Sequence, residues 1–363
     1  RVLGLGYYVA QQSQDDPKGL VFVGLVGLID PPRPEVFSAV KACKSAGIKI
    51  IVISGDTANT VKAIAQQTGI VNNPVAVTGA ELERMSDNEL EKYLKRDVVF
   101  ARTVPEQKMR IVKVLQKMGK IVAVTGDGVN DAPALKKADI GVAMGKNGTD
   151  VAKDASDIIL LDDNFATIVA AVEEGRSVYD NIKKFITYIL TSNIPEIIPF
   201  ILYILFPIPL AITVIQILCI DLITDIVPAI GLGNERPEKD VMQRPPRKRT
   251  DRLVTARMFL RSYGFIGPIE ALLAFGVFFA ILFAGGWAFG ASVAGTALYK
   301  QATVAFLGTI IICQIGNVLA CRTTRQSAIP LLKKRNRWIT MGIALELYFI
   351  MFITLVPFVF GFF

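Results

Sequence analysis

The sequence of 363 residues contains no histidine. This absence excludes Ser-His-Asp triads, imidazole general bases and histidine metal sites. Cysteine is scarce as well, and no two of Cys43, Cys219, Cys313 and Cys321 form a CxxC pair. Neither a disulfide framework nor a zinc site is therefore expected. Any chemistry must depend on carboxylates, lysine and backbone groups.

Charged residues nearly vanish from several long stretches beyond Lys184, and 52% of the chain is hydrophobic. Such a composition is too apolar for an ordinary soluble domain. Each apolar stretch is near the ~20 residues that span ~30 Å of hydrocarbon. These stretches predict five transmembrane helices, at Phe185–Phe206, Pro209–Leu232, Tyr263–Phe283, Ala302–Ala320 and Trp338–Phe360.

The formal net charge of +8 does not indicate a nucleic-acid partner, because many basic residues crowd two segments between apolar runs, 236–261 and 322–337. Basic loops of this kind mark the cytoplasmic side of a membrane protein. The connection 206–210 has no charge, and the connection 285–301 has only Lys300. We therefore expect a multi-pass protein of the cell membrane, embedded in the lipid bilayer, with its N-terminal domain in the cytoplasm.

The region from Leu20 to Leu161 alternates short β-branched runs with segments of helical periodicity. This alternation indicates a parallel sheet covered on both faces, the doubly wound α/β fold. The expected strands are Val21–Ile29, Ile48–Ser54, Val75–Thr78, Val98–Ala101, Ile121–Thr125, Ile140–Ala143 and Ile158–Leu161. The chain is thus predicted to be an α/β doubly wound domain followed by an all-α transmembrane helix bundle.

A glycine-bearing turn, Thr125-Gly126-Asp127-Gly128-Val129-Asn130-Asp131, follows one of these strands. Asp127 and Asp131 offer hard oxygen ligands for Mg²⁺, which prefers one or two carboxylates together with phosphate and water. We expect Gly126 and Gly128 to let the backbone approach closely and to take unusual φ angles. A tight turn with solvated aspartates is the alternative interpretation.

Two companions favour phosphate chemistry. Ser54-Gly55-Asp56 ends another strand and offers a hydroxyl and backbone N–H groups to phosphate oxygens. Lys108 lies near the start of a helix, where its ammonium group can neutralise a phosphoryl group. Ligands of such sheets gather at the carboxyl ends of the strands, so these residues are expected to converge.

Carboxylates also occur within or near the apolar spans, where charges are costly and usually functional. Asp221 and Asp225 are expected to share one helical face with Thr224 beside them, and the preceding span contributes Glu196. Ser192 and Asn193 add neutral oxygens to this predicted cation site. Pro195 and Pro228 free the carbonyls of Thr191 and Thr224 from helix hydrogen bonds.

Oxygen ligands without sulfur or imidazole suit hard cations such as Na⁺, K⁺, Ca²⁺ or H⁺. Three carboxylates this close cannot all stay charged in a low-dielectric region without a cation or protons. Glu270 stands apart from this group in the sequence. We expect it to hydrogen-bond across helices, and we expect Glu270→Gln to change ion activation little.

Together these motifs resemble the haloacid-dehalogenase superfamily and, within it, the P-type ATPases, over nearly the whole chain. The matching motifs are Asp30-Pro31-Pro32-Arg33, Ser54-Gly55-Asp56, Lys108 and Thr125–Asp131. The resemblance implies that Asp127 coordinates Mg²⁺, that Asn130 and Asp131 support the metal and a phosphorylated aspartate, and that ATP supplies the phosphoryl group. The family's Asp-Lys-Thr-Gly motif, which carries that aspartate, is not in this sequence.

The resemblance also implies a domain division. Residues 1–19 would end a nucleotide-binding domain, residues 20–163 would form a phosphorylation domain lacking its first strand, and residues 164–363 would form five transmembrane helices with a cytoplasmic stalk. The chain looks cut at both ends, so the remaining N-terminal part of a pump is an expected partner. Alone, the chain is expected to be inactive.

The sequences of two segments, Leu190–Glu196 and Cys219–Asp225, are most similar to those of sodium/potassium pumps and prokaryotic relatives. This similarity favours Na⁺ and K⁺ over Ca²⁺ as the transported cation. Gln314 and Glu346 match positions of that pump and suggest an additional cation site. Asn317 departs, because that pump has an aspartate there. Two alternatives stay open: a membrane-tethered phosphatase of the haloacid-dehalogenase superfamily, and a non-catalytic membrane module.

Overall fold

The computed structural model describes residues 2–7, 19–28, 31–325, 327–332 and 334–356. The chain divides into two compact units, Arg1–Val169 and Ala170–Phe363. Each unit is described by itself below.

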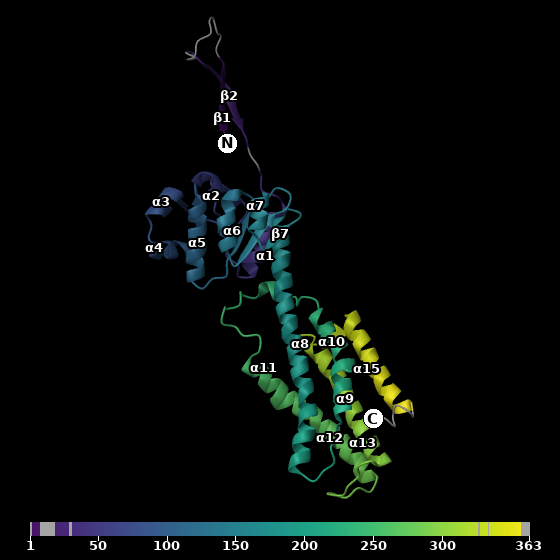
Figure 1. The fold of residues 1–363 in the computed structure, drawn as a ribbon. Helices are drawn as coiled ribbons and strands as arrows, with labels where there is room; N and C mark the ends of the chain where they lie inside the picture. The colour runs from purple at the N-terminus through teal and green to yellow at the C-terminus, as the bar shows by residue number, and fades with distance from the viewer. Residues whose placement is uncertain (1, 8–18, 29–30, 326, 333, 357–363) are drawn as a thin grey trace. The chain divides into compact units, whose positions relative to one another are not determined.

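Parallel strands organise the N-terminal unit (Figure 1). β3 (Val75–Thr78) pairs with β4 (Val98–Ala101), and a bridge joins Ile53 to Phe100 of β4, also in parallel. A second parallel sheet has the order β5 (Ala123–Gly126), β6 (Ile140–Met144), β7 (Ile158–Leu160). The predicted α/β class with parallel strands is confirmed, although the parallel strands form two hydrogen-bonded groups rather than one.

Among the described residues of this unit, seven helices and one 3₁₀ turn belong to the connections: α1 (Glu35–Ser45), α2 (Ala58–Gln67), α3 (Gly79–Arg84), α4 (Asp87–Leu94), α5 (Pro105–Lys117), η1 (Val129–Asp131), α6 (Ala132–Lys137) and α7 (Asp150–Asp154). Their starts follow local sequence signals. Thr78 with Glu81 and Ser86 with Glu89 form capping boxes. Pro105 occupies the first turn of α5, where its missing N–H is not needed.

One predicted strand has the wrong partner. β2 (Val21–Gly27) pairs antiparallel with β1 (Val2–Tyr7), in a register that runs from Val2 opposite Gly27 to Tyr7 opposite Val21. The expectation that Val21–Ile29 joins the parallel sheet is therefore wrong, and Ile29 lies outside the described residues. A β-branched run specifies a strand but neither its neighbour nor its direction.

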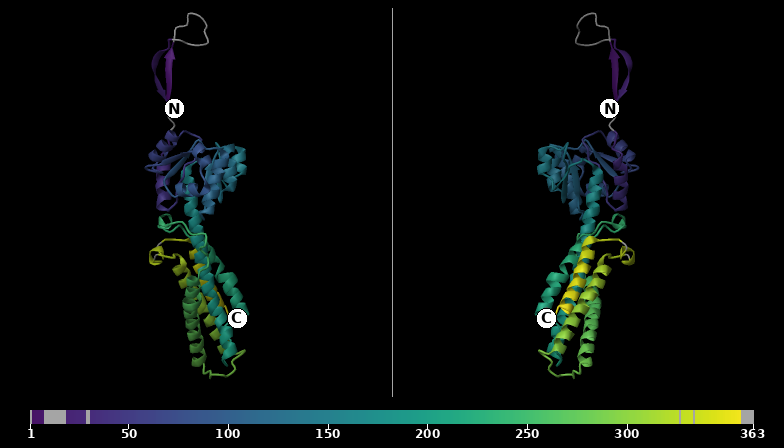
Figure 2. Two further views of the ribbon diagram at one scale, coloured as in Figure 1. Left: turned by 90° about the vertical axis from the view of Figure 1, so that its left-hand side faces the viewer. Right: turned by 90° about the vertical axis from the view of Figure 1, so that its right-hand side faces the viewer.

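The C-terminal unit is helical (Figures 1 and 2). Its elements are α8 (Phe165–Leu205, which starts in the first unit), α9 (Val214–Cys219), the π segment η2 (Ile220–Thr224), α10 (Ile226–Gly233), η3 (Val241–Gln243), α11 (Ala256–Arg261), the π segment η4 (Ser262–Ile266), α12 (Gly267–Ala284), α13 (Ala297–Cys321), α14 (Ile329–Leu332) and α15 (Arg337–Leu355). Neither π segment was predicted.

Within the described residues, five helical stretches are long and apolar enough to cross a membrane: Phe165–Leu205, Val214–Gly233, Ala256–Ala284, Ala297–Cys321 and Arg337–Leu355. A helix of sufficient length and apolarity is thus found at each of the five predicted spans, although residues 357–360 of the last predicted span lie outside the described residues. α8 has 41 residues, which corresponds to about 60 Å of helix, roughly twice the hydrocarbon thickness. Several of its turns must therefore lie outside the hydrocarbon.

Small residues let these helices approach closely. Gly342 of α15 lies against Pro228 of α10, because a Cβ at Gly342 would come within 2.7 Å of the proline Cγ. One helical turn away, Gly231 lies against Ile339. Gly267, at the start of α12, lies in the same way against Ile194 of α8.

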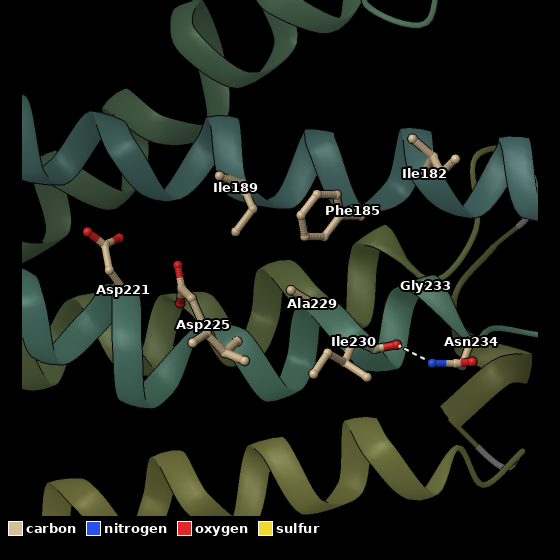
Figure 3. A pocket seen from close by; sticks show the side chains of 10 residues that line it. Ile182, Phe185, Ile189, Asp221, Asp225, Ala229, Ile230, Gly233 and Asn234 are labelled. Carbon is tan, nitrogen blue, oxygen red and sulfur yellow. Dashed lines mark hydrogen bonds between the residues drawn. The ribbon is translucent and has the colours of Figure 1, made fainter.

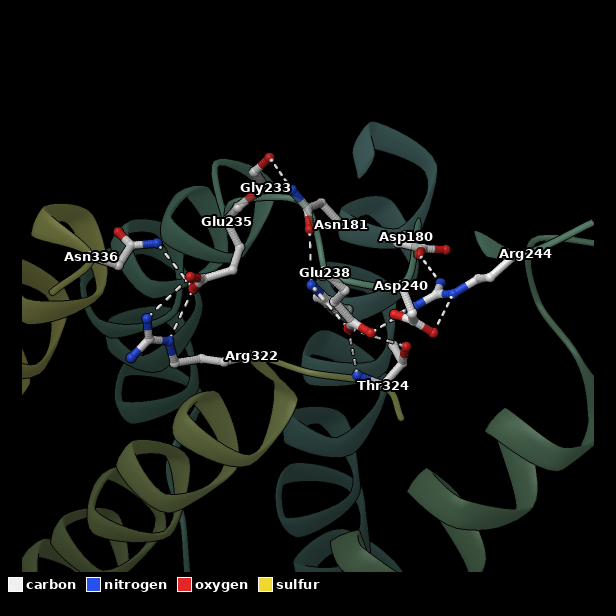
Figure 4. A network of polar contacts seen from close by, with 11 residues as sticks. Asp180, Asn181, Gly233, Glu235, Glu238, Asp240, Arg244, Arg322, Thr324 and Asn336 are labelled. Carbon is white, nitrogen blue, oxygen red and sulfur yellow. Dashed lines mark hydrogen bonds and ion pairs between the residues drawn. The ribbon is translucent and has the colours of Figure 1, made fainter. Parts of the chain in front are cut away.

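A polar network joins the loops at one end of this unit (Figure 4). Arg244 forms ion pairs with Asp180 at 2.5 Å, Asp240 at 2.6 Å and Glu238 at 2.8 Å. Lys184 of α8 lies 3.5 Å from Glu238. The loop after α10 is thus tied to the side of α8 by charge pairs as well as by packing.

Candidate functional site

The predicted phosphate lysine reaches the glycine turn. Lys108 Nζ lies 2.6 Å from Asp131 Oδ1. The other oxygen of Asp131 accepts hydrogen bonds from the backbone N–H groups of Asp127 at 3.3 Å and Gly128 at 3.2 Å. The turn therefore curls around the Asp131 carboxylate, and the start of α5 delivers a cation to the same group.

Only one of the two turn glycines is required for space. A Cβ at Gly126 would lie 2.4 Å from the Asp131 Cβ, whereas a Cβ at Gly128 would have its nearest neighbour at 3.6 Å. The expected unusual φ angles are wrong, since neither glycine has a positive φ and Gly128 is extended at −102°. The 3₁₀ turn that follows makes the bend without a left-handed residue.

Asp127 directly follows β5 and has an exposed side chain, and its carbonyl accepts from the Thr149 N–H at 2.8 Å. Asn130 is exposed beside it. No group of three or more histidine, cysteine, aspartate or glutamate side chains placed to hold a metal ion is found in the described part of the chain, so at this turn the carboxylates on offer are Asp127 and Asp131. Two carboxylates fit Mg²⁺, which completes its shell with phosphate and water.

The Ser54-Gly55-Asp56 turn closes on itself. The Ser54 hydroxyl donates to Asp56 Oδ2 at 3.0 Å and accepts from the Asp56 N–H at 3.1 Å. The turn is tied to the connection before α5, because Arg102 N–H donates to the Asp56 carbonyl and Thr103 N–H donates to the Ser54 carbonyl. No hydrogen bond joins this turn to the Asp127 turn within the described residues.

Sequence reasoning missed Asp163, which holds the neighbouring loop. Its carboxylate accepts from the N–H groups of Lys146 at 3.0 Å and Asn147 at 2.9 Å, and these bonds lower its pKa. Its carbonyl accepts from Arg33 at 3.0 Å. Arg33 is the last residue of the Asp30-Pro31-Pro32-Arg33 motif, whose Asp30 lies outside the described residues.

In the helical unit, Asp225 is 2% exposed and accepts two hydrogen bonds from α8. The Tyr188 hydroxyl donates to Oδ1 at 2.9 Å, and the Ser192 hydroxyl donates to Oδ2 at 2.5 Å. Ser192 was predicted but Tyr188 was not. Its position one helical turn before Ser192 could have revealed it.

Asp221 and Asp225 line one open groove of about 540 Å³ between α8 and α10. Figure 3 shows both carboxylates pointing toward α8. The expectation that they share a face is confirmed, although the turn between them is a π turn in which Asp225 N–H donates to the Ile220 carbonyl. Apart from Asn234 at one end, the rest of the lining is apolar, with Phe185 and Ile189 on the α8 side.

Glu196 is 7% exposed, and its Oε1 has no hydrogen-bond partner in the described part of the chain. Glu196 lies one helical turn after Ser192, whose hydroxyl donates to Asp225, so it is on the same face of α8 as that hydrogen bond. The buried Thr224 hydroxyl donates to the Ile220 carbonyl at 2.9 Å, which leaves its oxygen as an acceptor. Asn193 is half-buried beside this group.

Gln314 and Glu346 are both fully buried. Gln314 donates to Glu270 at 3.3 Å and accepts from Asn317 at 3.2 Å. The expected bond of Glu270 across helices is thereby confirmed. Neither carboxylate oxygen of Glu346 has a hydrogen-bond partner among the described residues.

Residues 209–363 match the family model described as cation transporting ATPase, C-terminus. Residues 6–139 and 109–172 match two models described as haloacid dehalogenase-like hydrolase. The chain is 45% identical over 364 residues to the sodium/potassium-transporting ATPase subunit alpha-4 of Rattus norvegicus, covering 85% of this chain and 35% of that one. It is 44% identical over 392 residues to the alpha-2 subunit of Homo sapiens, covering 93% and 38%.

This chain belongs to the P-type cation-transporting ATPases. It spans little more than a third of the length of the curated relatives it matches, 35% and 38% for the two named above. P-type ATPases generally use Mg²⁺ and ATP, which agrees with the donor set at Asp127 and Asp131. The five apolar helices agree with a membrane protein.

Proposed function

We propose that this chain is the C-terminal part of an ATP-driven P-type cation pump. In this proposal, turnover of an aspartyl phosphate at the α/β unit is coupled to transport of a hard cation by the helical unit, with Na⁺ and K⁺ favoured over Ca²⁺. The observation that carries it is the group of Glu196, Asp221 and Asp225 in the membrane part, together with the lysine and carboxylates of the glycine turn. The N-terminal domain lies in the cytoplasm.

The phosphoryl-transfer side rests on Lys108, Asp127 and Asp131. Asp127 and Asp131 would hold Mg²⁺, which neutralises phosphate charge when it is bound. Lys108 is already held at Asp131 by a 2.6 Å contact, so its charge is fixed at the same place. The Ser54-Gly55-Asp56 turn offers backbone N–H groups to phosphate oxygens. The phosphorylated aspartate and the ATP site belong to the remaining N-terminal part of the pump.

The transport side rests on Asp225. Its two hydrogen bonds fix the carboxylate between α8 and α10, and Ser192, Asn193 and Thr224 add neutral oxygens. A donor set made of oxygen alone suits hard cations. Most of the groove beside Asp221 is apolar, so we propose that membrane helices of the remaining part of the pump cover it.

The test is Asp225→Asn in the full-length pump, with ion-activated ATPase measured against Na⁺, K⁺ and Ca²⁺. The change removes the charge and replaces one acceptor oxygen by a donor. We expect the half-activating concentration of the transported ion to rise more than tenfold, which is about 1.4 kcal/mol or more. Thr309→Val is the matched control, because that hydroxyl bonds only to the Ala305 carbonyl of its own helix.

If Asp225→Asn and Asp221→Asn both leave all three activation curves unmoved, the ion site lies elsewhere and the transport proposal fails. A membrane-tethered phosphatase would share the haloacid dehalogenase-like match. It gives no reason, however, for buried carboxylates on several membrane helices or for the match over residues 209–363.

A further inference from the structure

Two exposed arginines lie at the membrane end of a basic segment. Residues 247–261 contain six lysines or arginines against a single acidic residue. One of these charges is already used, because the Arg247 guanidinium lies 3.1 Å from the centroid of the Tyr179 ring. Arg257 and Arg261 are exposed, and neither side chain has a hydrogen bond or ion pair in the part of the chain that the structure describes. Their charges are therefore available to a ligand.

The length of the helix places both arginines at the depth of the lipid headgroups. α11, η4 and α12 form one helical stretch, Ala256–Ala284, of 29 residues, which corresponds to about 44 Å of helix. The hydrocarbon of a bilayer is only about 30 Å thick, so about one turn extends beyond it at each end. Beyond Arg261 the stretch contains one charged residue, Glu270. Arg257 then lies among the headgroups, and Arg261, one turn deeper, reaches them with its long side chain.

The two arginines continue an exposed apolar stripe. Arg257, Arg261 and Phe265 follow one another at intervals of four residues, so they share one face of the helix. Leu272 lies two turns beyond Phe265 on the same face. Phe265 and Leu272 are 65% and 73% exposed, and Figure 1 shows α11 at the margin of the helical unit. One face therefore presents positive charge at headgroup depth and apolar side chains below it.

This combination matches the two parts of an anionic phospholipid. The fork of an arginine binds phosphate oxygens with two parallel hydrogen bonds. Basic clusters next to a membrane helix attract anionic lipids. The acyl chains of the same lipid would lie along Phe265 and Leu272. A free phosphate ion or an acidic peptide would use the arginines but leave the apolar residues below them uncovered, which is why we favour a lipid.

We propose that Arg257 and Arg261 form a binding site for the headgroup of an anionic phospholipid of the surrounding membrane, with the acyl chains along Phe265 and Leu272. The site requires that α12 spans the membrane, but it does not depend on the transported ion. It therefore goes beyond the proposed pump function. The bound lipid would anchor α11, which has no buried side chain of its own to hold it in place.

The test uses the full-length pump in phosphatidylcholine vesicles and a phosphatidylglycerol probe with a photoactivatable group in its acyl chain. Illumination, proteolysis and mass spectrometry measure how much probe attaches to the face of Phe265 and Leu272. We expect labelling that unlabelled phosphatidylglycerol suppresses and inorganic phosphate does not. Arg257→Gln and Arg261→Gln should each weaken the apparent affinity of the probe about fivefold. Arg261→Lys should weaken it less, because it keeps the charge and loses only the fork.

The matched control is Lys113→Gln combined with Lys117→Gln, which removes two exposed charges, also four residues apart, from α5 of the α/β unit. Labelling should then be unchanged. Equal labelling by a phosphatidylcholine probe, or unchanged labelling when Arg257→Gln and Arg261→Gln are combined, overturns the inference. Suppression by inorganic phosphate overturns it as well, because the site would then bind free phosphate.

An unlabelled face in the unaltered pump also overturns the inference, because another part of the pump would then cover it. None of these outcomes involves the carboxylates of the proposed ion site. The Asp225→Asn measurement of ion-activated ATPase therefore tests the proposed function separately, and either proposal can fail while the other holds.

Discussion

Arg322 and Glu235 form a buried ion pair at one end of the helical unit (Figure 4). Each of the two side chains also has hydrogen-bond partners outside the pair. The guanidinium binds the carboxylate with two hydrogen bonds of 2.9 and 3.1 Å. It also donates to the carbonyls of Leu331 and Lys334 at 2.6 and 2.9 Å. Asn336 gives Glu235 one further donor at 3.1 Å.

Removing one partner of a buried pair costs about 3–5 kcal/mol, because the other charge stays buried without compensation. The two side chains are 4% and 8% exposed, so solvent screens them little. For a unit of this size, we expect Arg322→Met to lower the melting temperature of the chain in detergent by roughly 10 °C. Glu235→Leu combined with Arg322→Met should lower it much less, because no charge is left unpaired.

The assay is a double-mutant cycle on the melting temperature, with Glu235→Leu, Arg322→Met and the double variant. The control is Lys153→Met, which removes an ion pair with the 99% exposed Asp150 and should cost less, because exposed pairs contribute about 0–1 kcal/mol. A double variant as destabilised as the sum of the two single variants would refute the reasoning, since the pair would then carry no coupling.

Two other predictions concern the remaining polar groups. Asp127→Ala in the full-length pump should abolish Mg²⁺-dependent phosphoenzyme formation with little loss of folded protein, because the side chain is exposed; normal phosphorylation by ATP would remove Asp127 from the site. The pKa of Glu238 is lowered, since burial opposes ionisation but the Thr324 N–H, Lys184 and Arg244 favour it. This stabilisation is present above the unfolded pKa of about 4.3 and is lost as the pH falls through the folded value. The melting temperature should therefore fall between about pH 5 and pH 3, and less so in Glu238→Gln; equal pH slopes would contradict this.

Much of the fold could be predicted from composition and periodicity. Five apolar stretches fixed the membrane spans, because a span must satisfy its backbone inside one helix. The strands of β3 to β7 were predicted within a residue or two, since each is a short apolar run between helices. The wrong partner of β2 has a different cause: pairing is a non-local property, and the same residues pair with whichever strand the chain brings to them.

The candidate sites were predicted as residue types but not as contacts. The spacing of Asp221 and Asp225 indicated a shared face, yet nothing in the residues indicated the π turn at Ile220–Thr224. Tyr188 was missed because a tyrosine in an apolar helix is usually an interfacial or packing residue. Glu270 was predicted to bond across helices, but its partner could not be predicted. The hydrogen bond from Gln314 depends on how α12 and α13 pack.

The parallel strands form two separate groups, and this separation indicates where the phosphorylated aspartate of the complete pump would lie. β4 has β3 on one side and the Ile53 bridge on the other, and β5 stands at the edge of its own sheet. Val112 of α5 packs with Ala134 of α6, so the helices that follow β4 and β5 are neighbours. The Ile53 edge of the first sheet and the β5 edge of the second sheet therefore face one another. Open edges of parallel strands are unusual, because such strands are normally paired and covered. The arrangement supports our proposal that the first strand of the phosphorylation domain comes from the remaining part of the pump and lies between these edges. Its carboxyl end would then bring the phosphorylated aspartate between the Ser54 turn and Asp127, which is why those two turns can serve one phosphate without bonding to each other.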